Sequence, residues 1–351
     1  MNFLKKTALT VAFSVAATSS FAETTLIHGE AGPNRGARAA ALQWYADQVA
    51  ERSAGDLKID IQWGGALFKS KAAMQSIGDG VADMGSVIAV YYPKDMAAYG
   101  IADLPVNNPD AWVGMRATDE LMRSSAAIQN NLADRDLRYI GTWTTSQVNI
   151  GCKDTAIRSV ADIAGKKVRG VGAYGKVMGE MGANLVSMSI YDAYQGLDTG
   201  LIDCSQGYSY AVSALKQAEV MTSYTMLDWG QVGGVGMFMN LDAYEGLSDE
   251  QRAVIDQTGM DMADEFGRLI TKANADAIIS MKEQGVEVIE LPAEERAKLV
   301  ASGAKFLDQW VETATSDGLD GAALLEEYKG LIAKYTAERD TNGYPWAKAS
   351  N

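Results

Sequence analysis

The segment Leu197-Asp-Thr-Gly-Leu-Ile-Asp203 repeats a pattern found earlier in the chain, in Ile77-Gly-Asp-Gly-Val-Ala-Asp83. In both copies the end of an expected helix is followed by glycine, two apolar or small residues, and an aspartate where a strand opens toward a crevice. Glycine supplies the left-handed turn that ends a helix. Two copies in matching positions of two β-α-β units indicate two similar lobes.

Short apolar strands alternate with amphipathic helices around both copies. Residues 24–28 and 57–63 are expected strands, and residues 37–53 between them are an expected helix. The same rhythm returns after residue 150, and it is typical of an α/β sheet with helices on both faces. Further along, Ser248-Asp-Glu-Gln251 forms a capping box, which predicts a long helix that runs to about residue 284.

The N-terminus has the three parts of a secretory signal peptide. Lys5 and Lys6 precede an apolar run over residues 8–17, and small residues occupy positions 20 and 22 before the expected cleavage site. The apolar run is too short to span a bilayer, and no cysteine near the cut could carry a lipid. We therefore expect residues 1–22 to be removed and the mature protein to be free in the periplasm, without a membrane anchor.

The composition narrows the class of function. The 351 residues carry a formal net charge of −14, which becomes more negative when the signal-peptide lysines are lost. An acidic surface argues against nucleic acid, which proteins hold with Lys and Arg, and it means that an anionic ligand needs specific buried cations. His28 is the only histidine, and no cluster has the spacing of a metal site or of a catalytic triad. The sequence predicts a protein that is not an enzyme and holds no metal.

Four further segments occur in a characteristic order. They are Arg158-Ser-Val-Ala-Asp-Ile-Ala-Gly-Lys-Lys-Val-Arg169, Ser187-Met-Ser-Ile-Tyr191, Tyr194-Gln-Gly-Leu-Asp-Thr-Gly-Leu-Ile-Asp203 and Tyr244-Glu-Gly-Leu-Ser248. Together they resemble the solute-binding proteins of tripartite ATP-independent periplasmic (TRAP) transporters, of the C4-dicarboxylate-binding (DctP) type. The resemblance covers nearly all of the mature chain and rests on order and spacing rather than on one motif.

This resemblance implies an α/β fold of the two-lobed type II periplasmic binding protein class, with the long helix bracing both lobes. Lobe 1 is expected to comprise residues 23–146 plus 234–273, and lobe 2 residues 147–233 plus 274–351. The implied partners are a small organic acid and the two membrane subunits of a TRAP transporter, and the expected state is a monomer. Docking on a signalling receptor is an alternative that the sequence does not separate from transport, and catalysis in the cleft is another.

The resemblance implies that Arg169 binds the carboxylate of the ligand. A guanidinium is planar, permanently charged, and offers paired donors that match two carboxylate oxygens. Many members of the family have a second arginine at a position that falls at or near Asn149 here. Its absence argues against a ligand with two carboxylates, although Asn149 can still donate a hydrogen bond.

Other residues are expected to line the cleft. Glu30 and Arg35 follow the first strand, and Ser86 ends the third. Four aromatic residues, which can either sandwich a planar ring or pack in a core, are Trp143, Tyr174, Tyr208 and Trp229. Together with the missing arginine they predict a monocarboxylate with an aromatic or apolar body, such as a benzoate-like acid. Sugar acids, dicarboxylates, α-keto acids, organosulfonates and ectoine are the alternatives.

Cys152 and Cys204 are the only cysteines, and both fall in the expected second lobe. The periplasm is oxidising, so we expect a structural disulfide, with two buried thiols as the alternative. Gly170-Val-Gly-Ala-Tyr-Gly175 has the spacing of a dinucleotide-binding loop. An exported protein has no nicotinamide supply, so we expect no cofactor.

Overall fold

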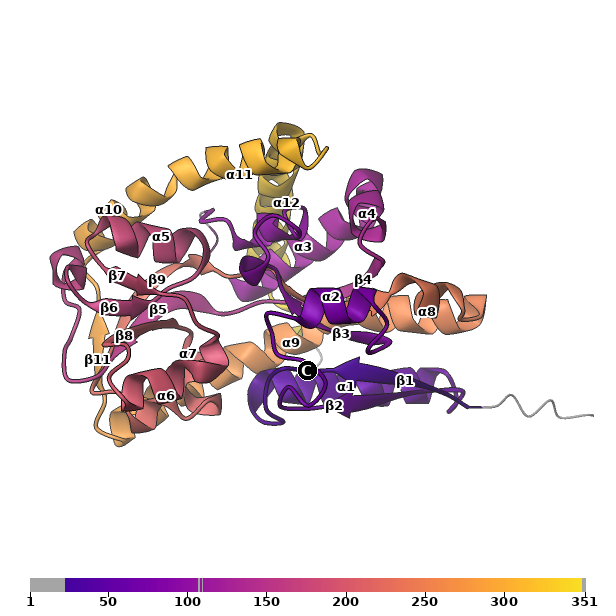
Figure 1. The fold of residues 1–351 in the computed structure, drawn as a ribbon, viewed down its shortest axis with the longest axis horizontal. Helices are drawn as coiled ribbons and strands as arrows, with labels where there is room; N and C mark the ends of the chain where they lie inside the picture. Colours follow the sequence, from indigo (N-terminus) through magenta and orange to yellow (C-terminus); the bar gives the residue numbers. More distant parts are fainter. Residues whose placement is uncertain (1–22, 107, 109, 349–351) are drawn as a thin grey trace, which may run out of the picture.

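The protein consists of two lobes that lie side by side (Figure 1), each built around one β-sheet. The computed structural model describes residues 23–106, 108 and 110–348. The expected signal peptide lies outside the described residues. The two-lobed α/β architecture expected from the sequence is confirmed.

The sheet of lobe 1 has five strands in the order β2-β1-β3-β10-β4. Strand β1 runs parallel to β2 and β3, whereas β10 runs antiparallel to β3 and β4. The strands are β1 (Thr24–Gly29), β2 (Leu57–Gln62), β3 (Met84–Ile88), β4 (Leu137–Trp143) and β10 (Val235–Asn240).

The sheet of lobe 2 has six strands in the order β11-β9-β5-β8-β6-β7. The strands are β5 (Gln147–Cys152), β6 (Lys167–Arg169), β7 (Asn184–Val186), β8 (Cys204–Gly207), β9 (Ser223–Gln231) and β11 (Glu287–Glu290). The chain therefore passes between the lobes from β4 to β5 and returns from β9 to β10. These two connections form the hinge.

Helices cover the outer faces of both sheets (Figure 1). Those whose sequence positions fall within lobe 1 are α1 (Gly36–Arg52), α2 (Ala73–Gly78), α3 (Ala111–Ser124), α4 (Ala126–Ala133) and α8 (Leu241–Glu245). Those that follow strands of lobe 2 are α5 (Gly172–Glu180), α6 (Ala193–Asp198) and α7 (Ser209–Ala214). The C-terminal part holds α9 (Asp249–Glu283), α10 (Ala293–Gly303), α11 (Lys305–Ser316), α12 (Gly321–Asn342) and α13 (Pro345–Lys348). Among the described residues, no helix combines the length and the apolar character that crossing a membrane requires.

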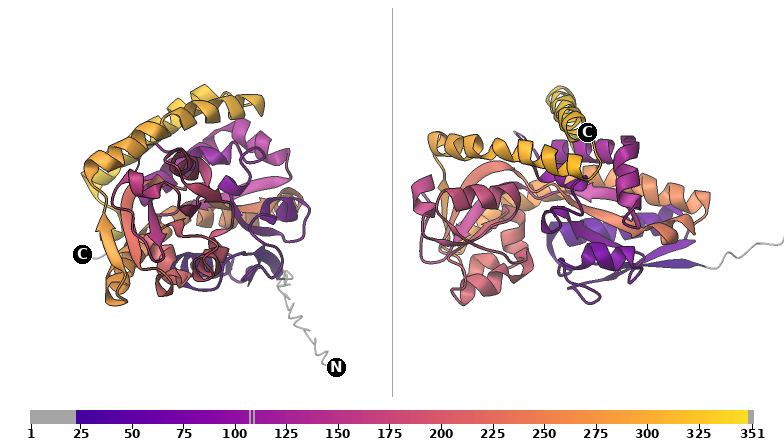
Figure 2. Two further views of the ribbon diagram at one scale, coloured as in Figure 1. Left: turned by 60° about the vertical axis from the view of Figure 1, so that its left-hand side comes forward. Right: turned by 45° about the horizontal axis from the view of Figure 1, so that its top comes forward.

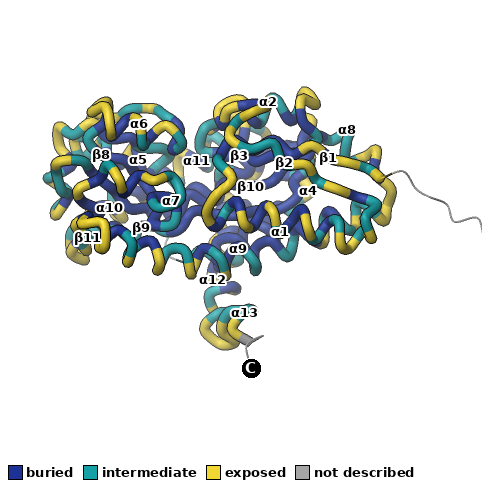
Figure 3. Tube along the Cα trace, turned by 90° about the horizontal axis from the view of Figure 1, so that it is seen from below, coloured by how far each residue is buried: buried dark blue, intermediate teal, exposed yellow. Residues whose placement is uncertain are grey.

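The long helix α9 braces both lobes, as expected. It begins at the expected capping box, in which the Gln251 backbone N–H donates to Ser248 Oγ at 3.2 Å and the Ser248 N–H donates to Gln251 Oε1 at 3.0 Å. The helix packs against α1 and β4 in lobe 1 and against α7 and β11 in lobe 2. Figure 3 shows it running beneath the two lobes.

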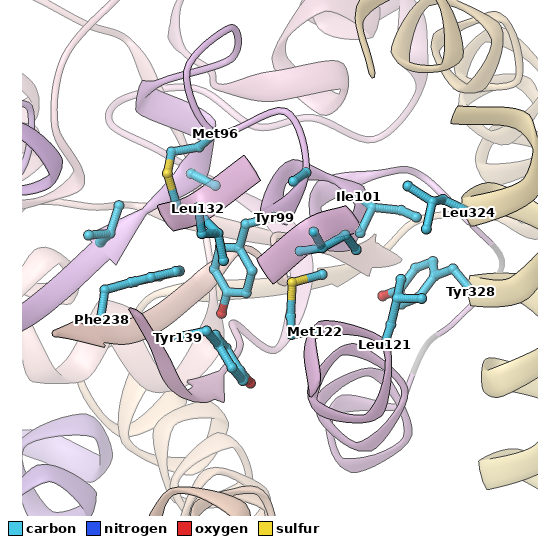
Figure 4. Packing of buried hydrophobic residues seen from close by; sticks show 14 of the residues in the cluster. Met96, Tyr99, Ile101, Leu121, Met122, Leu132, Tyr139, Phe238, Leu324 and Tyr328 are labelled. Carbon is cyan, nitrogen blue, oxygen red and sulfur yellow. The ribbon is translucent and has the colours of Figure 1, made fainter. Parts of the chain in front are cut away.

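The C-terminal helices depart from the expected division of the chain. The division expected from the sequence places residues 274–351 in lobe 2, but α12 packs on α3 of lobe 1. Leu324 and Tyr328 of α12 are buried in the same core as Tyr99 and Leu121 (Figure 4). Helix α11 leads to α12 across the upper side of the molecule (Figure 2). The expected boundary failed because which surface covers α12 depends on tertiary packing, here against α3.

Cys152 and Cys204 form the expected disulfide. The two residues lie opposite each other in the antiparallel pair of β5 and β8. The bond therefore joins neighbouring strands at the centre of the lobe 2 sheet, where both side chains are buried. This position gives it a structural role.

Glycines bring α9 and β4 close together. A Cβ at Gly259 would lie 2.0 Å from the Ile140 carbonyl oxygen, and a Cβ at Gly141 would lie 2.8 Å from the Gly259 carbonyl oxygen. Backbone atoms cannot move aside as a flexible side chain can. The contact between the brace and lobe 1 therefore depends on the absence of side chains at this crossing.

Gly259→Ala is expected to lower the free energy of unfolding by about 1–3 kcal/mol, because the added methyl group overpacks this contact. Urea denaturation followed by circular dichroism measures the change. Gly330→Ala is the matched control, since Gly330 lies in α12, where an added Cβ would meet no atom within 4 Å. There alanine should be neutral or stabilise the helix by up to about 1 kcal/mol. Equal stability of the two variants would contradict the close-approach argument.

Candidate functional site

A cavity lies between the lobes, next to the hinge. It contains about 640 Å³ of space that no protein atom fills, part of it open to solvent. Its wall is mainly apolar and aromatic, as in most small-molecule sites. The residues of interest are Arg38, Val90 and Tyr91 from lobe 1 and Arg169, Tyr208 and Tyr210 from lobe 2.

Arg169 ends β6 and points its guanidinium at this cavity. The residue is only 1% exposed. Its Nη1 donates to the Gln206 carbonyl oxygen at 2.8 Å, and its Nε donates to the Met188 carbonyl oxygen at 3.2 Å. Its Nη2 donates to the Tyr91 hydroxyl at 3.1 Å. All three partners are neutral, and no carboxylate among the described residues forms an ion pair with Arg169, so its charge has no counter-ion in the protein.

Tyr91 connects this guanidinium to the opposite lobe. Its hydroxyl accepts from Arg169 and also from the Ile190 backbone N–H, at 3.1 Å in each case. The hydroxyl proton is not used by either bond. It is therefore available to an acceptor in the cavity, beside Arg169.

Arg38, unlike Arg169, has a counter-ion within the protein. Its Nη1 lies 3.1 Å from Glu30 Oε1, and the two side chains are 11% and 0% exposed. The guanidinium also donates to the Tyr191 hydroxyl and lies 5.1 Å from the centre of the Tyr191 ring. Burial lowers the pKa of Arg38, but the Glu30 carboxylate and Tyr191 outweigh it and raise that pKa above its usual value. Arg38 is thus a cation whose charge Glu30 already neutralises.

Four buried titratable groups at or beside the cavity, Tyr191, Tyr208, Tyr210 and His28, are neutral at physiological pH. Burial raises the pKa of the Tyr208 and Tyr191 hydroxyls well above the usual value and that of Tyr210 to about 12. His28 lies beside Ser86, and burial lowers its pKa to about 4. The tyrosines therefore remain hydrogen-bond donors, and the buried part of the site carries one net positive charge, that of Arg169.

Three residues expected at the site line the cavity, namely Arg169, Tyr208 and Arg35. Arg35 is exposed at the mouth, where its Nε donates to the Ala214 carbonyl oxygen of lobe 2. Solvent weakens the field of such an exposed charge. Arg35 therefore does not replace the arginine that is missing at Asn149.

Three of the other expected residues lie behind the cavity wall. Glu30 pairs with Arg38, and Ser86 donates to Glu30 at 2.5 Å. Asn149 is buried in β5, where its Oδ1 accepts from the Asp228 N–H at 2.9 Å. These side chains meet protein partners, so the structure does not support their expected contact with a ligand.

Three of the expected aromatic residues, Tyr174, Trp229 and Trp143, pack against protein groups in this structure. Tyr174 and Trp229 meet edge to face, with ring centres 4.8 Å apart, and the Tyr174 hydroxyl donates to the Gln231 carbonyl oxygen at 2.9 Å. Trp143 is 1% exposed and belongs to the lobe 1 core. None of the three lines the cavity.

Sequence reasoning missed Arg38, Tyr91 and Tyr191. Arg38 lies three residues after the expected site residue Arg35, but Arg35 is the extended N-cap of α1 and only Arg38 lies within the helix. Tyr191 ends the segment Ser187–Tyr191, which contributed to the family resemblance. Both signals were present, but neither indicated which side chains turn inward.

Solved structures share this architecture. A TRAP solute-binding protein from Rhodoferax ferrireducens T118, in complex with copurified benzoate, superimposes with a TM-score of 0.80 at 23% identity and covers 90% of this chain and 99% of its own. A marine metagenome TRAP solute-binding protein specific for aromatic acid ligands, in complex with metahydroxyphenylacetate, gives a TM-score of 0.80 at 26% identity, with 89% and 99% covered.

Sequence comparison agrees with the structural likeness. The 2,3-diketo-L-gulonate-binding periplasmic protein YiaO of Escherichia coli (strain K12) is 23% identical over 315 residues, which are 88% of this chain and 92% of YiaO. The family model DctP, described as bacterial extracellular solute-binding protein, family 7, matches residues 29–313. Because that match spans most of the chain, the protein belongs to this family, the DctP-type solute-binding proteins of TRAP transporters.

Proposed function

We propose that this protein binds one small organic monocarboxylate with an aromatic or apolar body, such as a benzoate-like acid, in the cavity between its lobes. It does so in the periplasm, as a monomer, and passes the acid to the membrane subunits of a TRAP transporter. The observation that carries this proposal is the Arg169 guanidinium, which is 1% exposed and has only neutral protein partners.

A buried charge without a counter-ion is costly, because neutral hydrogen bonds replace only part of its hydration. A ligand carboxylate removes this cost and forms charge-assisted hydrogen bonds, which are about twice as strong as neutral ones. Tyr91 adds a neutral donor beside the guanidinium. The cavity is thus better matched to a carboxylate than to a neutral or cationic solute.

The balance of charge favours one carboxylate over two. Glu30 already neutralises Arg38, so a second carboxylate would have no unpaired buried cation within the cavity wall. The apolar and aromatic lining, which includes Val90, Tyr208 and Tyr210, suits a ring or an alkyl body. The 26% identical neighbour that is specific for aromatic acid ligands supports the same class.

Binding would favour the closed arrangement, because the ligand touches both lobes. Arg169 belongs to lobe 2 and Tyr91 to lobe 1, so a carboxylate held by both has more partners when the lobes are together. A ligand shifts a conformational equilibrium only through such differential contacts. Hinge closure around a ligand is a common form of this shift.

The experiment is a binding screen of the mature protein, unfolded and refolded to strip any carried-over ligand. Thermal shift is measured against benzoates, α-keto acids, dicarboxylates, uronates, sulfonates and ectoine, because a ligand that binds only the folded state raises the melting temperature. Isothermal titration then gives the Kd of each hit. Stabilisation by aromatic monocarboxylates is expected. Stabilisation by dicarboxylates or uronates alone would overturn the ligand class, and no response to any acid would overturn carboxylate binding.

Arg169→Gln is expected to weaken binding of the best monocarboxylate by a factor of about 30 or more, since truncating one partner of a buried charge pair typically costs about 2–5 kcal/mol. Isothermal titration measures the change. Arg158→Gln is the matched control: it changes the net charge equally, but the Arg158 side chain is 59% exposed and pairs with Glu287. Similar affinities for the two variants would show that Arg169 does not bind the carboxylate.

Tyr91→Phe removes the hydroxyl that links Arg169 to lobe 1. We expect the Kd of the monocarboxylate to rise about tenfold, since one hydrogen bond to a charged group contributes roughly 1.5–3 kcal/mol. Stopped-flow fluorescence should show most of the change in the dissociation rate. Tyr244→Phe is the control, because Tyr244 lies on α8 and its hydroxyl bonds Asp256 away from the cavity. An unchanged dissociation rate in Tyr91→Phe would exclude the hydroxyl from carboxylate binding.

A further inference from the structure

We propose that Arg38, Tyr191 and Glu30 form a second polar subsite of the cavity, which selects a neutral oxygen substituent of the bound acid. That substituent is a hydroxyl, ether or carbonyl oxygen at the far end of the ligand from its carboxylate. This inference rests on the proposed function, because it describes what the same cavity recognises besides the carboxylate.

The subsite offers hydrogen-bond donors that protein acceptors do not fill. Arg38 and Tyr191 both line the cavity. The described contacts of Arg38 with the Tyr191 hydroxyl and with Glu30 are both made by Nη1. Its Nε has no described acceptor, and its Nη2 lies against Gly32, where an added Cβ would be 1.5 Å away. The Tyr191 hydroxyl accepts from Arg38, so its own proton is free to donate.

The subsite lies between the lobes, in the cavity that both of them line. Arg38 lies in α1 of lobe 1 and Tyr191 follows β7 in lobe 2, so the subsite takes one side chain from each lobe. Both carboxylate oxygens of Glu30 accept hydrogen bonds within lobe 1, one from the Gly32 N–H at 2.6 Å and the other from Ser86 Oγ at 2.5 Å. These bonds fix the carboxylate that orients Arg38.

The charge of the subsite determines which substituent it accepts. Arg38 and Glu30 balance each other at 3.1 Å, so a neutral oxygen leaves the balance intact while it accepts from the free donors. An ammonium group would meet Arg38 with the same charge. A second carboxylate would add a negative charge near the buried Glu30, which is unfavourable where water cannot screen it. The subsite therefore selects a polar, uncharged substituent over a charged one.

The test compares matched acids by isothermal titration. The pairs are benzoate with 3-hydroxybenzoate and 4-hydroxybenzoate, and hexanoate with 6-hydroxyhexanoate, the last pair being independent of the aromatic ring. Isophthalate and 3-(aminomethyl)benzoate supply the charged substituents. In the wild-type protein we expect at least one hydroxy acid to bind about tenfold more tightly than its parent, as one or two added hydrogen bonds would give. Both charged analogues should bind more weakly than benzoate.

Tyr191→Phe keeps the ring that lies against Arg38 and removes only the hydroxyl. The ratio of hydroxy-acid to parent affinity should fall toward one in this variant, whereas Tyr244→Phe should retain the wild-type ratio. Using the ratio cancels any effect on lobe closure that acts on all ligands alike. The joint variant Glu30→Met with Arg38→Met removes the ion pair without leaving either charge buried alone, and it should abolish the same preference.

The outcomes separate the two proposals. If the parent acids bind but no hydroxy acid binds more tightly, or if Tyr191→Phe keeps the preference, the subsite is overturned and carboxylate capture stands. If isophthalate binds more tightly than the hydroxybenzoates, the cavity takes a second charge, which also overturns the subsite. If no acid of the panel binds to the wild-type protein, both proposals fail together.

Discussion

The Arg169 guanidinium lies between two lobes with no carboxylate partner among the described residues, and the rest of the structure is arranged around this charge. Two backbone carbonyls and the Tyr91 hydroxyl hold it in place without neutralising it. A protein with an excess of acidic residues repels anions at long range. Capture of an anion then requires a local cation of this kind, buried deeply enough to remain unscreened.

If Arg169 binds the ligand as proposed, the lobes have to separate to admit it. Several described hydrogen bonds between the lobes near the cavity have a charged donor, as in Arg169 to Tyr91 and Arg38 to Tyr191, but their acceptors are neutral. Ser70 Oγ and Ser189 Oγ lie 3.0 Å apart, Arg35 donates to the Ala214 carbonyl oxygen, and Tyr91 accepts from the Ile190 N–H. Such bonds contribute little net free energy, because water replaces them when the lobes separate. Under the proposed function, the ligand carboxylate is the partner that favours the closed arrangement over the open one.

Helix α9, which braces both lobes, has to keep its contact with lobe 1 if the lobes move as proposed. Helix α9 touches elements of both sheets, and its crossing with β4 is so close that only glycine fits at positions 259 and 141. If the lobes move as proposed, this rigid contact leaves the movement to the two interlobe connections, β4 to β5 and β9 to β10.

Sequence reasoning predicted the parts that depend on local pattern or on family motifs. The α/β alternation, the capping box at Ser248 and the disulfide of Cys152 with Cys204 are all present. Arg169 emerged from the resemblance, and the structure places it at the cavity wall. These features were accessible because each depends on a few neighbouring residues or on a segment shared with a family.

What the sequence did not predict depends on tertiary contacts. Arg35 is the extended N-cap of α1 and is exposed, whereas Arg38, in the first turn of the helix, is paired with Glu30 inside. Trp143 and Trp229 could have faced a ligand or a core, and both pack in cores. In each case the outcome depends on which distant segment packs nearby. Periodicity identifies a face that will be buried, but it does not name the partner.

The most direct test is a crystal structure of the protein with its tightest-binding monocarboxylate. The account predicts that the carboxylate oxygens lie within hydrogen-bonding distance of the Arg169 guanidinium, that one of them accepts from the Tyr91 hydroxyl, and that the pair of Arg38 and Glu30 remains intact. A carboxylate seated on Arg35 or Arg38 instead, with Arg169 keeping only neutral protein or water partners, would contradict it.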